Sequence, residues 1–263
     1  MEKLEHELWI VQAVNAALGP VVAAAMRALG RPVPTHGDII PDYIVMAGLI
    51  VVGWTVVCLF ARRGLSVDNP SKLQIVLEDA VSAMLSLLHD YVGVKGPRYL
   101  PIVATMAVFI LTANLMGLVP GLKSPTANIN VTLGCALTVW VYYHIQGVKE
   151  QGIGPYLKHF AAPPGAPLFI APIMLPIEII SHISRVLSLS LRLFGNIFGE
   201  DLVILILFSI IPFLVPLPMM FLGIITASLQ AFIFVLLTTI YLGGAVATEH
   251  EHHEHGDMVA GEV

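Results

Sequence analysis

A single arginine interrupts one of the most apolar stretches of the chain. In SRVLSLSLRLFGNIFGEDLV, residues 184–203, Arg192 is surrounded by leucine and phenylalanine. A charged side chain at membrane depth costs about 2.5–3.5 kcal/mol on insertion scales, and such residues usually mark a path for ions or protons. The stretch therefore predicts a function in ion movement. The alternative is a permanent ion pair that only ties helices together, for which the acidic candidates are Glu178, Glu200 and Asp201.

Several polar side chains fall on one line with Arg192 if this segment is a helix. At about 100° per residue, they lie within roughly 60° either side of that line. The set comprises Glu178, Ser181, His182, Arg185, Ser188, Arg192, Asn196 and Glu200. A row of polar groups predicts a pathway better than a single structural pair does. At the start of the row, the alternative is that Glu178, His182 and Arg185 simply reach interfacial water.

A second, quieter pair of polar residues follows in the next apolar segment. Gln230 and Tyr241 are eleven positions apart, about three helical turns, so they share one face. Gln230 is a deep hydrogen-bonding group, and its alternative role is to hold two helices together. Gly195 and Gly199 would let another helix approach closely, although that spacing alone is weak evidence.

The composition identifies an integral membrane protein. Of the 263 residues, 57% are hydrophobic and only 12% are charged, with a mean hydropathy of +0.84, which no ordinary water-soluble domain approaches. Cys58 and Cys135 lie in apolar segments, which argues against a disulfide framework or a cysteine metal site. The net charge of −5 and the lack of a phosphate-binding glycine loop predict no nucleic-acid partner, no bound nucleotide and no cofactor.

The first half of the chain predicts two surface helices and three crossings. Residues 9–30 follow an acidic start and carry polar residues, which favours an interfacial amphipathic helix over a signal peptide. The run 43–61 is long enough to span the roughly 30 Å hydrocarbon core. Asn69 and Pro70 predict the cap and first residue of an amphipathic helix along the bilayer surface. Two further spans are predicted at 101–118 and 131–146, joined by a loop rich in proline and asparagine.

The last third predicts a long helical hairpin. The apolar stretch 168–208 has about 41 residues, which as one helix would measure roughly 60 Å, twice the thickness of the hydrocarbon core. We therefore expect a strongly tilted helix, followed by a second long helix after Pro218. The predicted fold class is an all-α polytopic membrane protein with five membrane-crossing helices, including this hairpin, plus amphipathic surface helices.

The positive-inside rule orients the chain. Basic residues concentrate in 62–100 and after the third span, which places both regions and the C-terminus in the cytoplasm and the N-terminus outside. The predicted regions are an N-terminal interfacial segment at 1–42, a membrane domain at 43–247 and a His/Glu-rich cytoplasmic tail at 248–263. That tail contains His250, His252, His253 and His255, yet a flexible solvated tail is the expected state and no metal site is predicted.

The polar row is part of a pattern that resembles subunit a of F-type ATP synthases. The residues that carry the resemblance are LSLRLFGNIFGEDLV at 189–203 and LQAFIFVLLTTIYL at 229–242. SPTANINVTL at 124–133 and PIEIISHIS at 176–184 support it. The resemblance extends from about residue 40 to 247, and the helices expected above agree with that family's layout.

The resemblance implies a non-catalytic, proton-translocating stator subunit of a bacterial inner membrane. Its partners would be a ring of c subunits, b-type peripheral stalk subunits, other ATP synthase subunits and the lipid bilayer. Arg192 would be the essential arginine that faces the ring's carboxylate and separates two offset aqueous half-channels. A guanidinium favours an ionised carboxylate nearby, and its own pKa is too high to pass a proton on.

The two half-channels would be lined by residues on either side of Arg192. The resemblance assigns Asn196, Asp201 and Gln230 to the outer half-channel. It places Glu178, Ser184, Arg185 and Ser188 on the cytoplasmic side, where His182 lies on the same row.

The chain departs from the family pattern near the outer half-channel. Some members have a histidine where this chain has Gly223, and here the pair Glu200 and Asp201 replaces a glycine followed by one acid. We expect the proton relay to be rearranged, with Glu200 as the substitute.

Two other classes of membrane protein are less consistent with the sequence. A secondary transporter would use the arginine to bind an anionic substrate, but it predicts internal repeats and paired broken helices, and neither is visible. A quinone- or haem-binding subunit needs paired histidines within spans. His144 is the only histidine near the interior of the third predicted span, and the sequence offers no obvious partner for His182.

Overall fold

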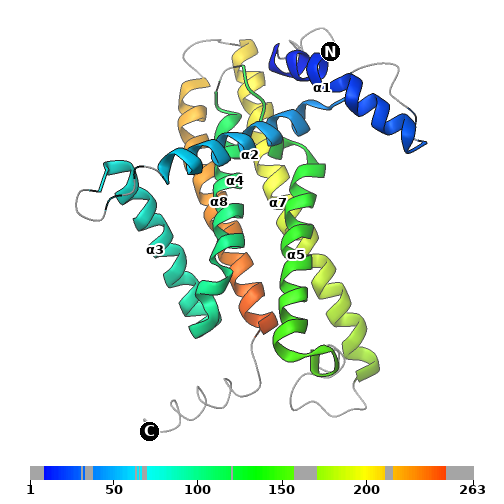
Figure 1. Cartoon of the computed structure of the whole chain (residues 1–263), viewed down its shortest axis with the longest axis vertical. Coiled ribbons are helices and arrows are strands. Elements are labelled where there is room, and N and C mark those ends of the chain that lie inside the picture. The colour runs from blue at the N-terminus through cyan, green and yellow to red at the C-terminus, as the bar shows by residue number, and fades with distance from the viewer. Residues whose placement is uncertain are drawn as a thin grey trace. The chain divides into compact units, whose positions relative to one another are not determined.

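The computed structural model of the chain is mainly helical in its described part. It describes residues 9–30, 32, 38–62, 64, 66, 70–119, 121–156, 171–210 and 216–246, and no strand occurs among them. The predicted histidine-rich tail at 248–263 lies outside these residues. The helices are α1 Trp9–Ala28, α2 Asp42–Ala61, α3 Lys72–Val92, α4 Leu100–Met116, α5 Ile129–Gln151, α7 Ala171–Ile210 and α8 Pro216–Val246, with 3-10 turns η1 Gly93–Tyr99 and η2 Pro125–Ala127 (Figure 1).

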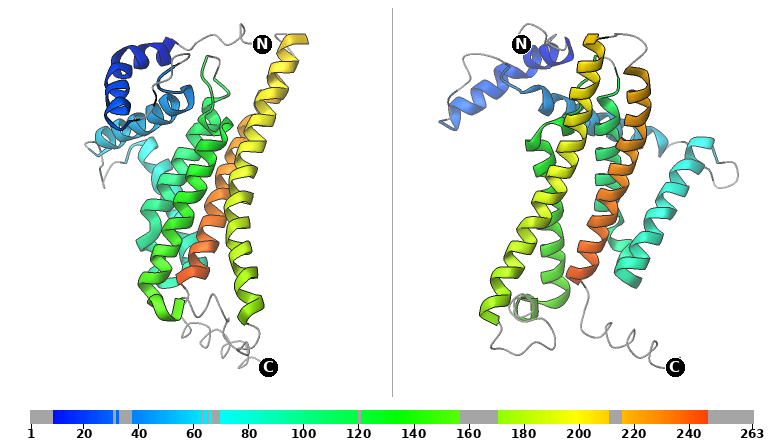
Figure 2. Two further views of the ribbon diagram at one scale, coloured as in Figure 1. Left: turned by 90° about the vertical axis from the view of Figure 1, so that its right-hand side faces the viewer. Right: turned by 180° about the vertical axis from the view of Figure 1, so that it is seen from behind.

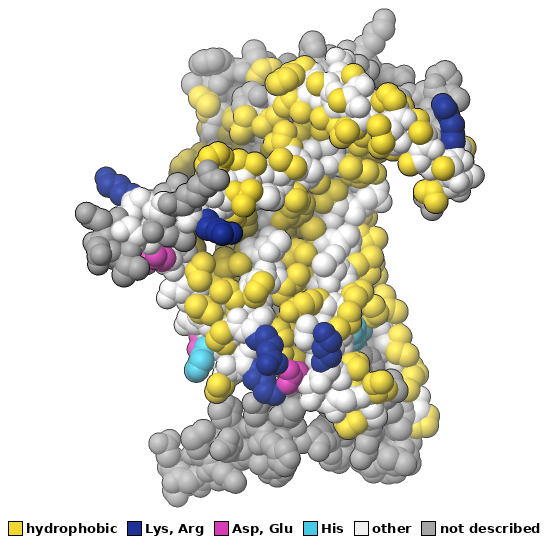
Figure 3. Space-filling view, in the orientation of Figure 1, with side chains coloured by type: hydrophobic (Ala, Val, Ile, Leu, Met, Phe, Trp, Pro, Cys, Tyr) yellow, Lys and Arg dark blue, Asp and Glu magenta, His cyan; other side chains and the backbone are white. Residues whose placement is uncertain are grey.

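Four stretches of the described part of the chain are long and apolar enough to cross a membrane. They are Trp9–Ala28, Asp42–Ala61, Gln74–Met116 and Leu217–Val246. On the face seen in Figure 3, hydrophobic side chains cover much of the described surface, as expected for contact with lipid. The all-α membrane fold is confirmed. Because α1 meets the criterion of length and hydropathy while α5 and α7 are not among the four, the five crossings and the surface position of α1 stay predictions.

The predicted long helix forms as one continuous element. α7 has 40 residues and contains Pro176 in its second turn, which at 1.5 Å per residue gives about 60 Å. Figure 2 shows it as one unbroken ribbon beside the shorter α8 of 31 residues. Its angle to a bilayer stays a prediction. The length matters for function because one helix carries every residue of the predicted polar row.

The predicted start of α3 is wrong by two residues. Asn69, the expected cap, lies outside the described residues, and Pro70 precedes the helix. The cap is Ser71, whose Oγ accepts a hydrogen bond from the backbone N–H of Gln74 at 3.2 Å. Serine satisfies one of the free N–H groups of the first turn as well as asparagine does. The general position of the helix after the first span was therefore predictable, and its first residue was not.

The chain forms two compact units. The first comprises Met1–Pro70, Phe109–Val131 and Phe194–Gln230. Its apolar core includes Val11, Met46 and Met116. Two hydrogen bonds fasten α1 to the segment before α2: Asn15 Nδ2 donates to the carbonyl of Ile40 at 3.0 Å and Asn15 Oδ1 accepts from its N–H at 2.8 Å.

The second unit comprises Ser71–Val108, Thr132–Leu193 and Ala231–Val263. Its α5 and α8 meet at Gly147, where an added Cβ would lie 2.8 Å from the carbonyl oxygen of Ala245. Gln151 Nε2 donates to the same carbonyl at 2.9 Å. Glu150 joins α5 to η1, because it binds Lys95 at 2.6 Å and Arg98 at 2.9 Å. These contacts fix α5 against both neighbours, and α5 carries one wall of the site described next.

Candidate functional site

The polar row on α7 borders the buried face of the helix and is open at its centre. Exposed side chains include those of Arg192 and Ser188 in the row and of Ser184 beside it. His182, at the other edge of the row, is only 7% exposed, and Leu193 is fully buried. The row therefore has a packed edge and an open edge. Exposed side chains on the open side are free to meet another molecule.

Arg192 makes no ion pair with any residue that the structure describes. Among the residues that the structure describes, no acidic group lies within 4 Å of its guanidinium. Its neighbours Leu187 and Leu191 are about half exposed, at 49% and 52%. The alternative of a permanent pair with Glu178, Glu200 or Asp201 is thus not the arrangement found. The guanidinium is presented outward within an apolar surface.

Asn196 and Gln230, both predicted site residues, contact each other in the first unit. Asn196 Nδ2 donates a hydrogen bond to Gln230 Oε1 at 3.0 Å. Gln230 is 2% exposed, and a buried amide needs such a partner. The resemblance assigns the two residues to one half-channel, and the structure joins them by this hydrogen bond.

Glu200 occupies the space above Gly223. A Cβ built on Gly223 would coincide with the carboxylate oxygen Oε1 of Glu200 and lie 2.8 Å from Leu118 Cδ2. Glycine at 223 leaves room for the carboxylate in this position, and a larger residue would require the Glu200 side chain to move. Sequence analysis predicted that Glu200 substitutes for a side chain missing at Gly223. In the structure, the Glu200 carboxylate occupies the space that a side chain at 223 would fill.

Asp201 points to a different neighbour, at the end of α4. Its Oδ1 is 3.4 Å from where a Cβ on Gly117 would be, and the Ser124 side chain reaches the same place. Ser124 leads into buried polar residues that the sequence analysis did not select. Thr126 Oγ1 donates to Asn114 Oδ1 at 2.8 Å, and the hydroxyls of Ser124 and Thr126 are 2.7 Å apart. The only sequence signal was the asparagine within α4 and the polar loop after it.

Glu178 and His182 form a pair in the second unit, one turn apart on α7. His182 Nε2 lies 3.1 Å from Glu178 Oε1, and His182 Nδ1 lies 2.7 Å from the hydroxyl of Tyr143 on α5. The sequence offered no obvious partner for His182, and the structure gives it two. Glu178 lies four residues away on the predicted polar row, whereas Tyr143 is 39 residues away in sequence, beyond the reach of helix periodicity.

The two histidines considered for the haem-binding alternative, His144 and His182, lie side by side. The rings of His144 and His182 have centroids 4.8 Å apart, and His144 Nδ1 contacts the hydroxyl of Tyr156 at 2.5 Å. Both nitrogens of His182 are already engaged by Tyr143 and Glu178, so this ring has no nitrogen left to ligate a haem iron. The proximity of the histidines thus does not favour the haem-binding alternative.

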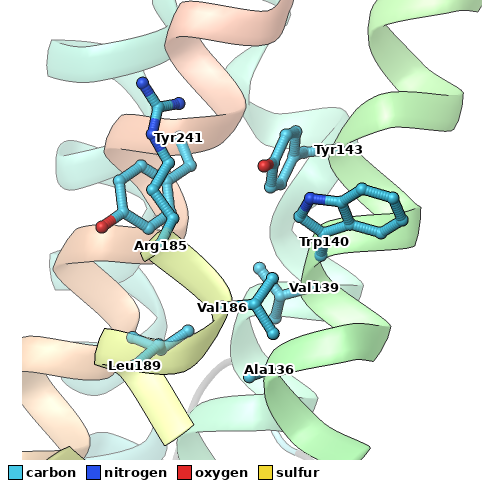
Figure 4. A pocket seen from close by; sticks show the side chains of 8 residues that line it. All are labelled: Ala136, Val139, Trp140, Tyr143, Arg185, Val186, Leu189 and Tyr241. Atoms are coloured by element: carbon cyan, nitrogen blue, oxygen red, sulfur yellow. The ribbon is translucent and has the colours of Figure 1, made fainter. Parts of the chain in front are cut away.

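Arg185 and Tyr241 also meet in the second unit. The guanidinium carbon lies 5.1 Å from the centre of the Tyr241 ring, within the range of a cation–π contact. Figure 4 shows Arg185 along Tyr241 on one side of a small pocket, with Trp140 and Tyr143 projecting from α5 on the other. Among serines, Ser190 is buried and its hydroxyl lies 3.1 Å from that of Thr132.

No metal centre is present among the described residues. No group of three His, Cys, Asp or Glu side chains there has the geometry to hold an ion. Cys58 is exposed and Cys135 is buried, and neither is in a disulfide. The four histidines of the tail lie outside the described residues.

The comparisons with known proteins agree on one family. Residues 43–243 match the family model described as ATP synthase A chain. ATP synthase subunit a of Citrifermentans bemidjiense is 47% identical over 211 residues, covering 80% of this chain and 89% of that protein. The homologue from a Geobacter species, strain M21, is 46% identical, and that of Geobacter sulfurreducens is 44% identical, with the same coverage. With a family match over most of its length and relatives well above 30% identity, the chain belongs to the ATP synthase subunit a family.

Proposed function

We propose that this chain is the proton-translocating stator subunit of the membrane sector of a bacterial ATP synthase. It is a non-catalytic subunit of the complex and binds no nucleotide itself. The observation that carries the proposal is Arg192, an exposed guanidinium without an ion-pair partner among the described residues, at the centre of the polar row on α7. A charge presented at membrane depth needs a partner of opposite sign outside the chain.

That partner is a carboxylate on a ring of c subunits. Arg192 favours the ionised carboxylate, and a guanidinium stays protonated and so does not relay a proton. The carboxylate leaves Arg192 when the ring turns and the group takes up a proton. Proton flow and ring rotation are thereby coupled, and direct leakage past the arginine is prevented.

Two half-channels meet on either side of Arg192. The outer one uses Asn196, Glu200, Asp201 and Gln230, for which the Asn196–Gln230 hydrogen bond and the placement of Glu200 over Gly223 are the support. The cytoplasmic one uses Glu178, His182, Ser184, Arg185 and Ser188, supported by the Glu178–His182 pair and by the exposure of the two serines. Carboxylates and imidazole are groups that take up and release protons near neutral pH.

The remaining assignments follow from the same orientation. The chain spans the inner membrane several times, with the N-terminus outside and the C-terminus in the cytoplasm, as the distribution of basic residues indicates. It is held against the c ring by b-type peripheral stalk subunits and other subunits of the complex.

Replacing the arginine tests the proposal. In membrane vesicles that carry the complete ATP synthase, Arg192→Ala is expected to abolish ATP-driven proton pumping and to permit a passive proton leak, because the barrier between the half-channels is gone. Arg98→Ala, at an arginine bound to Glu150 and 69% exposed, is the matched control and should pump normally. Retained pumping by Arg192→Ala would refute the mechanism.

A further inference from the structure

Between His182 and Ser188, the polar row contains Arg185, whose guanidinium does not relay a proton. His182 and Ser188 are six residues apart on α7, a rise of about 9 Å, whereas a hydrogen bond spans about 3 Å. The two residues also face differently, since His182 is buried and Ser188 is exposed. A proton leaving the arginine region therefore needs groups from another helix to reach His182.

α5 places polar groups next to this part of α7. Tyr143 is 2% exposed, and its hydroxyl lies 2.7 Å from His182 Nδ1. The small pocket in Figure 4 is lined by Tyr143, Trp140, Arg185 and Tyr241 together with aliphatic residues. On α7, Arg185 lies between His182 and Ser188, and Leu189 directly follows Ser188. The pocket therefore lies beside the part of α7 that separates His182 from Ser188.

The pocket is suited to hold water. The indole Nε1 of Trp140 is buried and has no hydrogen-bond partner among the described residues, and a buried donor of this kind is usually satisfied by an ordered water. The Tyr143 hydroxyl and the Arg185 guanidinium provide further polar walls. These three groups give an ordered water the polar partners that it needs.

We propose that Tyr143 is a proton-relay residue of the cytoplasmic half-channel, linking water in this pocket to His182 and Glu178. This inference rests on the proposed function. Tyr143 Oη accepts a proton from pocket water while its own proton moves to Nδ1 of His182. The Nε2 proton of His182 then passes to a Glu178 oxygen, which releases it to cytoplasmic water. Exchange of the imidazole protons with water and rotation of the tyrosine hydroxyl restore the starting state.

The groups around His182 suit this role. From α5 it faces Tyr143 and His144, from α7 Glu178 and Arg185, and from α8 Tyr241 lies against Tyr143 with ring centroids 6.3 Å apart. Tyr156 adds a second tyrosine–histidine pair by its contact with His144. Arg185 opposes a lasting positive charge on the imidazole, which favours transfer onward to Glu178.

Two phenylalanine variants of adjacent tyrosines test the relay. In vesicles with the complete complex, Tyr143→Phe is expected to slow ATP-driven proton pumping about 2- to 10-fold, the rate equivalent of one hydrogen bond. Tyr142→Phe, whose ring instead contacts Tyr99, should pump at the wild-type rate. Assembly is checked by the amount of complex in the vesicles. Equal rates for the two variants would overturn the relay.

A merely structural role is separated by restoring a proton carrier. Tyr143→His provides an exchangeable proton at the same position and should pump faster than Tyr143→Phe, whereas a packing role predicts no gain. His182→Gln keeps a hydrogen-bonding partner for Tyr143 but cannot relay a proton, so it should slow pumping as well. Pumping at the wild-type rate by His182→Gln would refute the relay, even if Tyr143→Phe fails to assemble. If Tyr143→Phe pumps at the wild-type rate and Arg192→Ala does not pump, only the relay is refuted. If Arg192→Ala still pumps, the proposed function is refuted.

Discussion

The two polar groups on either side of Arg192 are built from different chemistry. In the first unit, amides and carboxylates dominate: Asn196 binds Gln230, and Glu200 sits in space left by Gly223. In the second unit, imidazole and phenol rings are already paired, as in Tyr143 with His182. Neither Glu200 nor Asp201 makes an ion pair with a described residue, whereas Glu178 has His182. The comparison teaches that the carboxylates of one group lack ion-pair partners among the described residues, whereas the titratable groups of the other are already paired with each other.

The largest expected effect comes from removing a carboxylate of the first group. Glu200→Gln keeps the shape of the side chain but cannot carry a proton, and we expect proton-driven ATP synthesis to fall by about 100-fold, the low end for loss of an acid–base group. Glu178→Gln should lose less, because Glu178 is 32% exposed and water can replace it. Unchanged synthesis by Glu200→Gln would show that Glu200 is not a relay.

Gly147→Ala tests how tightly the second unit is packed. The added Cβ would lie 2.5 Å from the Tyr156 ring and 2.8 Å from the Ala245 carbonyl oxygen, so we expect a loss of about 1–3 kcal/mol in stability, as for other overpacked sites. Thermal unfolding of the purified complex measures it. Gly134→Ala on the same helix, with nothing within 4 Å, is the control, and equal unfolding temperatures would contradict the close packing.

Gly223→Ala should affect function more than stability. The new methyl group collides with the end of a flexible carboxylate, which can move at little cost in folding energy. We expect proton-driven synthesis to fall about 2- to 10-fold, equivalent to losing one well-placed hydrogen bond, with an unfolding temperature close to that of the wild type. Gly244→Ala on α8, open around its Cβ, should change neither. Full activity of Gly223→Ala would mean that the position of Glu200 is unimportant.

The smallest effect is expected at Glu150, on the surface of the second unit. The hydrogen bond from Lys95 holds the pKa of the Glu150 carboxyl below its usual value of 4.5. A lowered pKa in the folded state stabilises the protein above that usual value, and the contribution is lost as the pH falls below it. Because Lys95 and Arg98 are 50% and 69% exposed, Glu150→Gln should cost at most about 1 kcal/mol at pH 7.

Unfolding of the wild type and Glu150→Gln at decreasing pH checks this sign. The difference between the two proteins should shrink below pH 4.5. A difference that grows in acid would show that the ion pairs do not stabilise the second unit.

Helix positions and the outline of the site could be predicted from the sequence because both depend on local patterns. Apolar length predicted α2, α4, α5, α7 and α8 to within a few residues, and helical periodicity placed Arg192 and Asn196 on one line. The start of α3 was missed because two adjacent residues, Asn69 and Ser71, can both cap a helix.

The packed partners of the site could not be predicted, because they come from distant parts of the chain. Tyr143 and His182 are 39 residues apart, and Thr126 meets Asn114 across a loop. Periodicity along one helix gives no information about which face of a neighbouring helix packs against it. It also did not distinguish the buried edge of the row, at His182, from the open edge, at Ser188.

Because α7 is one continuous helix, it tolerates inserted or deleted residues poorly. Arg192 lies 21 residues after Ala171 and 18 before Ile210, with polar groups on both sides along the same helix. One inserted or deleted residue between Arg192 and Asn196 would rotate everything beyond it by about 100°. Every later polar side chain would then point to a different neighbour at once. Substitutions such as a glutamate at 200 with a glycine at 223 preserve that angular spacing, so we expect variation here to proceed by exchange of side chains rather than by insertion or deletion.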